Sequence, residues 1–136
     1  MWALQREGAK VTLFARDATR GALLAKRFDV EFRNLPAATF AEFDVVVNAT
    51  PLGTAGSLES ETIVTSRELL GAGLVYDLVY NPVATAFLRE AAAANCEMIG
   101  GLEMLIGQAA AQYQLWTGHE APIAVMKQAA QAHLGY

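Results

Sequence analysis

Three residues in the last third of the chain share one face of a predicted helix and could bind a ring and a hydroxylated ligand. Gly101, Met104 and Gln108 lie at i, i+3 and i+7, so they are neighbours on a helix surface. Glycine permits close backbone approach, methionine can pack on a flat ring, and glutamine can hydrogen-bond hydroxyls. Periodicity alone more often gives a core methionine and a surface glutamine, so both interpretations stay open.

Small polar residues follow a predicted buried strand at 44–49. The segment Asn48-Ala-Thr-Pro-Leu-Gly53 places Asn48, Thr50 and Pro51 at the carboxyl end of that strand, where open parallel sheets bind ligands. The amide and hydroxyl could contact the ribose or phosphates of a nucleotide. The ordinary chemistry of a Pro/Gly turn explains them equally well.

The next predicted strand, 74–80, has the same arrangement in Asp77-Leu-Val-Tyr-Asn-Pro82. Tyr80 emerges at its end, with a hydroxyl able to bind a carboxylate, although a core tyrosine is the more common outcome. Asp77 lies inside an apolar strand and therefore needs a hydrogen-bond partner. We expect Asp77 to be structural first.

Two arginines follow the first visible strand, 11–15. Arg16 and Arg20 could clamp one phosphate from two sides, and arginines at this place in a dinucleotide fold take the 2′-phosphate of NADP. Two solvated arginines at a helix start are slightly favoured on spacing alone. Asp17 is expected to cap that helix, and it could also weaken phosphate binding.

The apolar pattern alternates strands and helices, which predicts an α/β fold with a doubly wound, mostly parallel sheet. Residues 1–7 have the pattern of the end of a helix that stops at Gly8. Strands are predicted at 11–15, 30–33, 44–49, 74–80 and 96–99, and helices at 19–28, 66–70, 82–95, 102–116 and 122–134.

No G-x-G-x-x-G motif occurs in the sequence. If residues 1–7 end the first helix, the first strand and its glycine-rich loop lie upstream. That strand is central in a Rossmann-like sheet. We therefore expect a Rossmann-like sheet without its first strand, and a slot about 10 Å wide between the strands at 11–15 and 44–49.

Composition narrows the class of protein. The chain has 136 residues, 54% of them hydrophobic, and a net charge of −4, which argues against nucleic acid or an anionic membrane as a partner. The single Cys96 allows no internal disulfide, and His119 and His133 have no metal-ligand spacing. These features predict a cytoplasmic protein without a metal site.

The motifs together resemble the C-terminal, NADP-binding part of shikimate dehydrogenase. The family pattern comprises Asn-Ala-Thr-Pro-hydrophobic-Gly, Asp-hydrophobic-hydrophobic-Tyr-x-Pro with a threonine three residues later, Gly-Leu-x-Met-Leu-x-x-Gln-Ala, and a Trp-Thr-Gly helix end. The matching segments, in that order, are 48–53, 77–82 with Thr85, 101–109 and 116–118.

The resemblance implies hydride transfer between NADPH and 3-dehydroshikimate, giving shikimate, in aromatic amino-acid biosynthesis. Tyr80 and Gln108 would then bind substrate, and Gly101 and Met104 would meet the nicotinamide. The rest of NADP would contact Arg16, Arg20, Asn48, Thr50 and Pro51.

The chain departs from the family pattern in three ways. Ala15-Arg16-Asp17 stands for the family's Asn-Arg-Thr, and Thr54 stands where a methionine is usual. The N-terminal substrate domain, which carries the family's catalytic lysine and aspartate, has no counterpart in the sequence. No catalytic residue is therefore assigned here.

We expect residues 1–118 to form a truncated NADP-binding domain and residues 119–136 a helix that packs toward the N-terminal domain, supplied in cis or in trans. The chain alone is expected to be inactive. A noncatalytic NADP-binding or subunit-interaction module, and a relative that acts on quinate, remain the alternatives.

Overall fold

The computed structural model describes residues 1–35 and 39–135. The chain divides into two compact units, Met1–Thr39 and Phe40–Tyr136. None of the helices in the described ranges combines the length and apolar character needed to cross a membrane.

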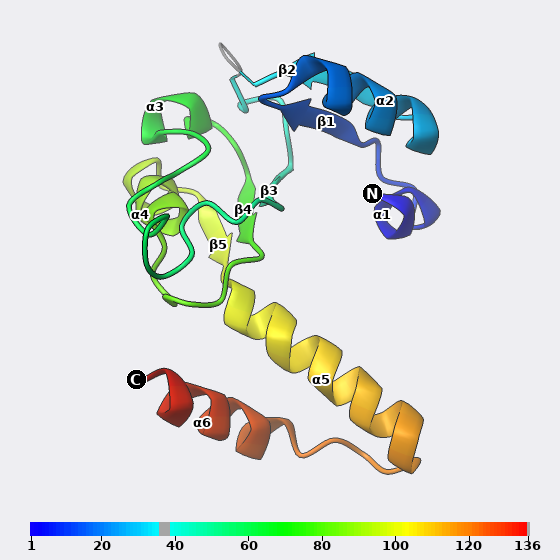
Figure 1. The fold of residues 1–136 in the computed structure, drawn as a ribbon, viewed down its shortest axis with the longest axis vertical. Helices are drawn as coiled ribbons and strands as arrows, with labels where there is room; N and C mark the ends of the chain where they lie inside the picture. The colour runs from blue at the N-terminus through cyan, green and yellow to red at the C-terminus, as the bar shows by residue number, and fades with distance from the viewer. Residues whose placement is uncertain (36–38, 136) are drawn as a thin grey trace. The chain divides into compact units, whose positions relative to one another are not determined.

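The first unit contains two parallel strands and the helix that connects them (Figure 1). Its elements are α1 (Trp2–Arg6), β1 (Thr12–Ala15), α2 (Ala18–Phe28) and β2 (Glu31–Asn34). Helix α2 packs closely because Gly21 faces β2, where an added Cβ would lie 2.3 Å from Phe32 Cε2. The helix is capped at its start by Asp17 and at its end by Asp29, which has a left-handed backbone.

The second unit contains a three-stranded parallel sheet in the order β3-β4-β5. Its strands are β3 (Val45–Asn48), β4 (Leu74–Asp77) and β5 (Glu97–Ile99), and its helices are α3 (Ser66–Leu69), α4 (Ala86–Ala93), α5 (Gly101–Thr117) and α6 (Ile123–Leu134). Fully buried Val75, Leu69, Phe87 and Ala91 form the centre of its core.

Every predicted strand and helix is present, and the predicted α/β class with parallel strands is confirmed. Two boundaries were wrong. Strand β4 ends at Asp77 instead of Tyr80, because the Asp77 side chain accepts a hydrogen bond from the backbone N–H of Val79. Helix α4 begins at Ala86, after its cap Thr85, so Pro82 lies outside the helix instead of in its first turn.

The strands form two sheets, β1-β2 and β3-β4-β5. Within residues 1–35 and 39–135, β1 pairs only with β2, and β3 pairs only with β4. One edge of β1 and one edge of β3 are thus without a strand partner in the described residues. This pairing agrees with the expected sheet that has no central first strand.

Candidate functional site

An open pocket of about 310 Å³ lies at the carboxyl ends of β3 and β4. The carboxyl ends of parallel strands are where such sheets bind ligands. Three residues singled out by the sequence, Thr50, Pro51 and Tyr80, line this pocket together. The other residues of the lining are Ala49, Thr54, Leu78, Val79 and Asn81.

Asn48 lies beneath this pocket and is completely buried. Its Nδ2 donates to the carbonyl of Leu52 at 3.2 Å and to Asp77 Oδ1 at 2.9 Å. Its Oδ1 accepts from the backbone N–H of Thr50 at 2.9 Å and from the Thr50 hydroxyl at 2.8 Å. Because an asparagine amide has two donors and two acceptor positions, Asn48 is fully satisfied within the protein. It shapes the turn that carries Thr50.

Asp77, the other buried polar group at this edge, has the partners that the sequence analysis required. Its Oδ1 accepts from Asn48 Nδ2 and from the Val79 N–H at 3.0 Å, and its Oδ2 accepts from the Thr85 hydroxyl at 2.5 Å. All three contacts suit a carboxylate, which only accepts. The expected structural role of Asp77 is confirmed.

Four residues of the lining have polar side chains, Thr50, Thr54, Tyr80 and Asn81, and two of them were predicted site residues. Thr50 is exposed; its hydroxyl donates to Asn48 and accepts from the Leu52 N–H at 3.2 Å, which leaves one acceptor position. Tyr80 is 44% exposed, so it is a surface residue of the pocket and not a core tyrosine. A phenol at this place can donate to a carboxylate.

Gly101 begins α5 directly against the end of β4. An added Cβ at this position would lie 2.3 Å from the Val79 carbonyl oxygen and 2.7 Å from the Tyr80 nitrogen. The close approach expected of this glycine is therefore made to the protein's own backbone. Gly101 sets where α5 starts relative to Tyr80.

Met104 and Gln108 follow Gly101 on α5 as predicted. Met104 is half-buried and Gln108 is exposed, and neither belongs to the lining of the pocket. Their assignment to nicotinamide and substrate stays a prediction.

Arg16 and Arg20 belong to the first unit, and both are exposed. Asp17 caps α2 as expected, with its Oδ1 accepting from the Arg20 N–H at 3.0 Å. The same carboxylate forms an ion pair with Arg20, at 3.5 Å between Nε and Oδ2. Arg20 therefore already has an anionic neighbour, and its assignment to a 2′-phosphate stays a prediction.

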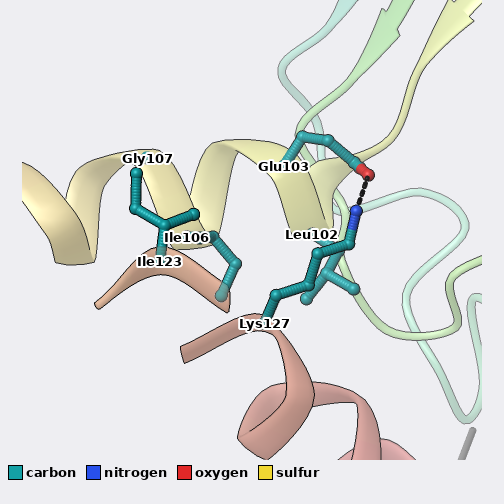
Figure 2. Close-up of a pocket in the computed structure, with 6 residues that line it drawn as sticks. All are labelled: Leu102, Glu103, Ile106, Gly107, Ile123 and Lys127. Carbon is teal, nitrogen blue, oxygen red and sulfur yellow. Dashed lines mark ion pairs between the residues drawn. The ribbon is translucent and has the colours of Figure 1, made fainter. Parts of the chain in front are cut away.

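A second pocket, of about 220 Å³, lies between α5 and α6. Figure 2 shows its apolar floor and the ion pair at one side, where Lys127 Nζ lies 3.6 Å from Glu103 Oε1. The lining comprises Leu102, Glu103, Ile106, Gly107, Ile123 and Lys127. This pocket contains none of the predicted site residues.

The other reactive side chains of residues 1–35 and 39–135 do not cluster into a metal site. His119 and His133 are exposed, and the described residues include no group of three or more His, Cys, Asp or Glu that could hold a metal ion. Cys96 is buried, and burial raises the pKa of its thiol. A thiol with a raised pKa is a poor nucleophile at neutral pH.

Thr85, Leu78 and Asn81 were not among the predicted site residues. Leu78 and Asn81 line the pocket because they directly follow β4, a position that the strand-end rule could have indicated. Thr85 is fully buried and bonds to Asp77. Only its place in the family pattern pointed to it.

A family model and individual relatives both match this chain to shikimate dehydrogenases. The family model of the shikimate 5′-dehydrogenase C-terminal domain matches residues 101–131. Shikimate dehydrogenase (NADP(+)) of Oleidesulfovibrio alaskensis is 40% identical over 119 residues, which are 84% of this chain and 42% of that protein. The same enzyme of Chlorobium chlorochromatii is 37% identical over 135 residues, 92% of this chain and 47% of the relative.

Solved structures agree with these relatives. Shikimate 5-dehydrogenase of Thermus thermophilus, in complex with NADP(H) and shikimate, has a TM-score of 0.84 at 34% identity; the match covers 96% of this chain and 48% of that one. Quinate dehydrogenase of Corynebacterium glutamicum, in complex with NAD, has a TM-score of 0.80 at 28% identity, with 96% and 49% covered.

The chain therefore spans about half the length of the curated relatives it matches, from 42% to 47% for the two described above. The matched half contains the Asn48–Gly53 turn, the end of β4 and the whole of α5. In sequence and in fold, the chain belongs with the C-terminal portion of the NADP-dependent shikimate dehydrogenases.

Proposed function

We propose that this chain is the NADP-binding part of a shikimate dehydrogenase, which reduces 3-dehydroshikimate to shikimate. The observation that carries the proposal is the meeting of Thr50, Pro51 and Tyr80 in one pocket at the carboxyl ends of β3 and β4. Tyr80 is on the protein surface there. The substrate and the cofactor are those for which the relatives are named.

The residues of the pocket fit the nicotinamide end of NADP. Ala49, Thr50 and Pro51 are exposed and small, so a ring and its ribose can approach the backbone at the strand end. Thr50 has one acceptor position left for a ribose hydroxyl. NADPH, when bound, supplies the hydride.

The residues of this chain then bind the substrate and NADP and orient them. Tyr80 donates a hydrogen bond from its phenolic hydroxyl to the substrate carboxylate, and Gln108 hydrogen-bonds the substrate hydroxyls. Met104 packs on the nicotinamide ring, while Arg16 and Arg20 hold the 2′-phosphate. Asn48 acts through Thr50, because its own polar atoms are all used.

Proton transfer to the substrate's ketone oxygen needs a side chain within hydrogen-bond reach. The resemblance places that side chain, a lysine with an aspartate, in the N-terminal domain of the family. The proposal therefore requires that domain in cis or in trans, and the chain by itself should bind without turning over.

An assay for NADPH formation from shikimate and NADP⁺ tests this. The pure chain should give no turnover, and the separately produced N-terminal half of the Thermus thermophilus relative should restore some when added. Gln108→Ala should remove the restored activity. Turnover by the pure chain that Gln108→Ala abolishes would contradict the need for a second domain.

Quinate is the second candidate substrate, since the solved quinate dehydrogenase shares the fold at a TM-score of 0.80. Quinate and shikimate differ at the ring, where residues outside this chain are expected to make most contacts. Because those residues set the choice, the assay with quinate in place of shikimate separates the two when the second domain is this protein's own and not the Thermus thermophilus half.

A further inference from the structure

A chain of buried hydrogen bonds connects the pocket to the start of α4. It consists of Thr85, Asp77, Asn48 and Thr50, and we call it the Thr85 relay. The first three residues are completely buried. Thr50 is the exposed end that lines the pocket.

The relay begins at the N-terminus of α4. The Leu88 N–H donates to the Thr85 hydroxyl oxygen at 3.2 Å, and that hydroxyl donates to Asp77 Oδ2 at 2.5 Å. Thr85 thus accepts from one element and donates to another. Thr85 also lies close to the turn after β3, since a Cβ added to Gly53 would lie 3.3 Å from Thr85 Cβ.

Asp77 connects Thr85 to both strand ends that form the pocket. Through Oδ1 it holds the Val79 N–H, in the residue next to Tyr80, and it holds Asn48 Nδ2. Asn48 in turn accepts from the N–H and the hydroxyl of Thr50. Of the polar residues in the lining, Thr50 and the backbone next to Tyr80 are therefore positioned from one carboxylate.

We propose that Thr85 is a positioning residue of the site, which acts through Asp77 and Asn48 to hold Thr50 and Tyr80 in the geometry that the ligand binds. This inference rests on the proposed function for the identity of the ligand. Its physical basis is that buried hydrogen bonds to a charged group are strong and that bonds in a network reinforce one another.

The test replaces the Thr85 side chain in the full chain. Thr85→Val keeps the shape and removes the hydroxyl, whereas Thr85→Ser keeps the hydroxyl. NADP⁺ affinity is measured by calorimetry below the unfolding transition, and backbone amide shifts are measured by NMR. We expect Thr85→Val to weaken NADP⁺ binding by about three- to tenfold and to shift the amides of Thr50 and Val79. Thr85→Ser should restore both readouts.

Thr62→Val is the matched control. The Thr62 hydroxyl also donates to a protein group, the Val64 carbonyl at 2.8 Å, and Thr62 is half-buried in the same unit outside the pocket. This variant should lower stability while leaving the Thr50 amide and NADP⁺ affinity unchanged. A folded Thr85→Val protein with wild-type affinity and wild-type Thr50 and Val79 amides would overturn the inference.

A measurement on the wild-type chain keeps the inference testable if Thr85→Val does not fold. Coupling between two sites is reciprocal, so NADP⁺ should slow hydrogen exchange of the Leu88 amide, which lies outside the pocket lining. Unchanged Leu88 exchange at saturating NADP⁺ would overturn the inference. Absence of any NADP⁺ binding by the wild type would instead overturn the proposed function, and the Thr50 amide in Thr85→Val would then decide on the relay alone.

Discussion

At the scale of single residues, two glycines of α5 have opposite surroundings. Gly101 touches the backbone at the end of β4, with an added Cβ only 2.3 Å from the Val79 oxygen. Gly107, six positions later, has nothing within 4 Å of such a Cβ. The first glycine is required by packing, whereas the second is not.

We therefore expect Gly101→Ala to lower the free energy of unfolding by about 1–3 kcal/mol, because a backbone atom cannot move aside as a flexible side chain does. Gly107→Ala should raise it by about 0.5–1 kcal/mol through helix propensity. Urea unfolding of both variants measures the difference. Equal effects of the two substitutions would contradict the assigned packing of Gly101.

Asp17 is the residue-scale feature that bears on the choice of cofactor. It caps α2 and pairs with Arg20. Asp17→Asn retains the capping oxygen and removes the charge that competes with a 2′-phosphate. Because an exposed ion pair contributes about 0–1 kcal/mol, NADP⁺ should bind up to about fivefold more tightly.

Calorimetric titration at low salt with NADP⁺ and with NAD⁺ measures this effect. NAD⁺ carries no 2′-phosphate, so its affinity serves as the control and should stay the same. A parallel rise for both nucleotides would show that Asp17 acts on something other than the 2′-phosphate.

At the scale of elements, the short helix α3 depends on a carboxylate at its start. Glu68 Oε2 accepts from the N–H of Thr65 at 2.6 Å and from the Thr65 hydroxyl at 2.5 Å. The hydrogen bond from the Thr65 side chain is the main cause that lowers the pKa of Glu68 below its ordinary value of 4.5. Helix α3 is also tied to α4, where Glu90 accepts from the Ser66 N–H at 2.6 Å.

The lowered pKa of Glu68 determines how the stability of the chain changes with pH. A carboxyl whose pKa is lower in the folded chain stabilises it fully above the unfolded value, and this contribution is lost as pH falls through the folded pKa. Wild-type stability should therefore fall below pH 4.5 more steeply than that of Glu68→Gln. Urea unfolding from neutral to acidic pH measures both curves, and Thr65→Val should flatten the curve in the same way. Parallel curves would contradict the role of Glu68.

The elements themselves were largely predictable. Runs such as Val45-Val-Val47 and the apolar spacing of 19–28 are local signals, and the structure has a strand and a helix at these places. The start of α4 was predicted too early because its cap, Thr85, is fixed by Asp77, eight positions away. The sequence also left Asn48 open between cofactor contact and turn, since its satisfaction depends on Asp77, 29 positions away.

At the scale of the whole molecule, the chain consists of two units whose strands form separate parallel sheets. Within the described ranges, β1 and β3 each have one edge without a strand partner. Such edges can pair with another chain. This observation, together with a chain about half as long as its relatives, supports the proposal that activity requires a further domain.

The proposed function depends on one pocket, at the ends of β3 and β4, which should bind the nicotinamide end of NADP. The most direct measurement is an NMR titration of the isotope-labelled chain with NADP⁺, followed by shikimate. We expect saturable amide shifts at Thr50, Tyr80 and Gly101 with NADP⁺, and a further shift at Tyr80 with shikimate. Saturable shifts confined to other residues, or no shifts at millimolar NADP⁺, would contradict it.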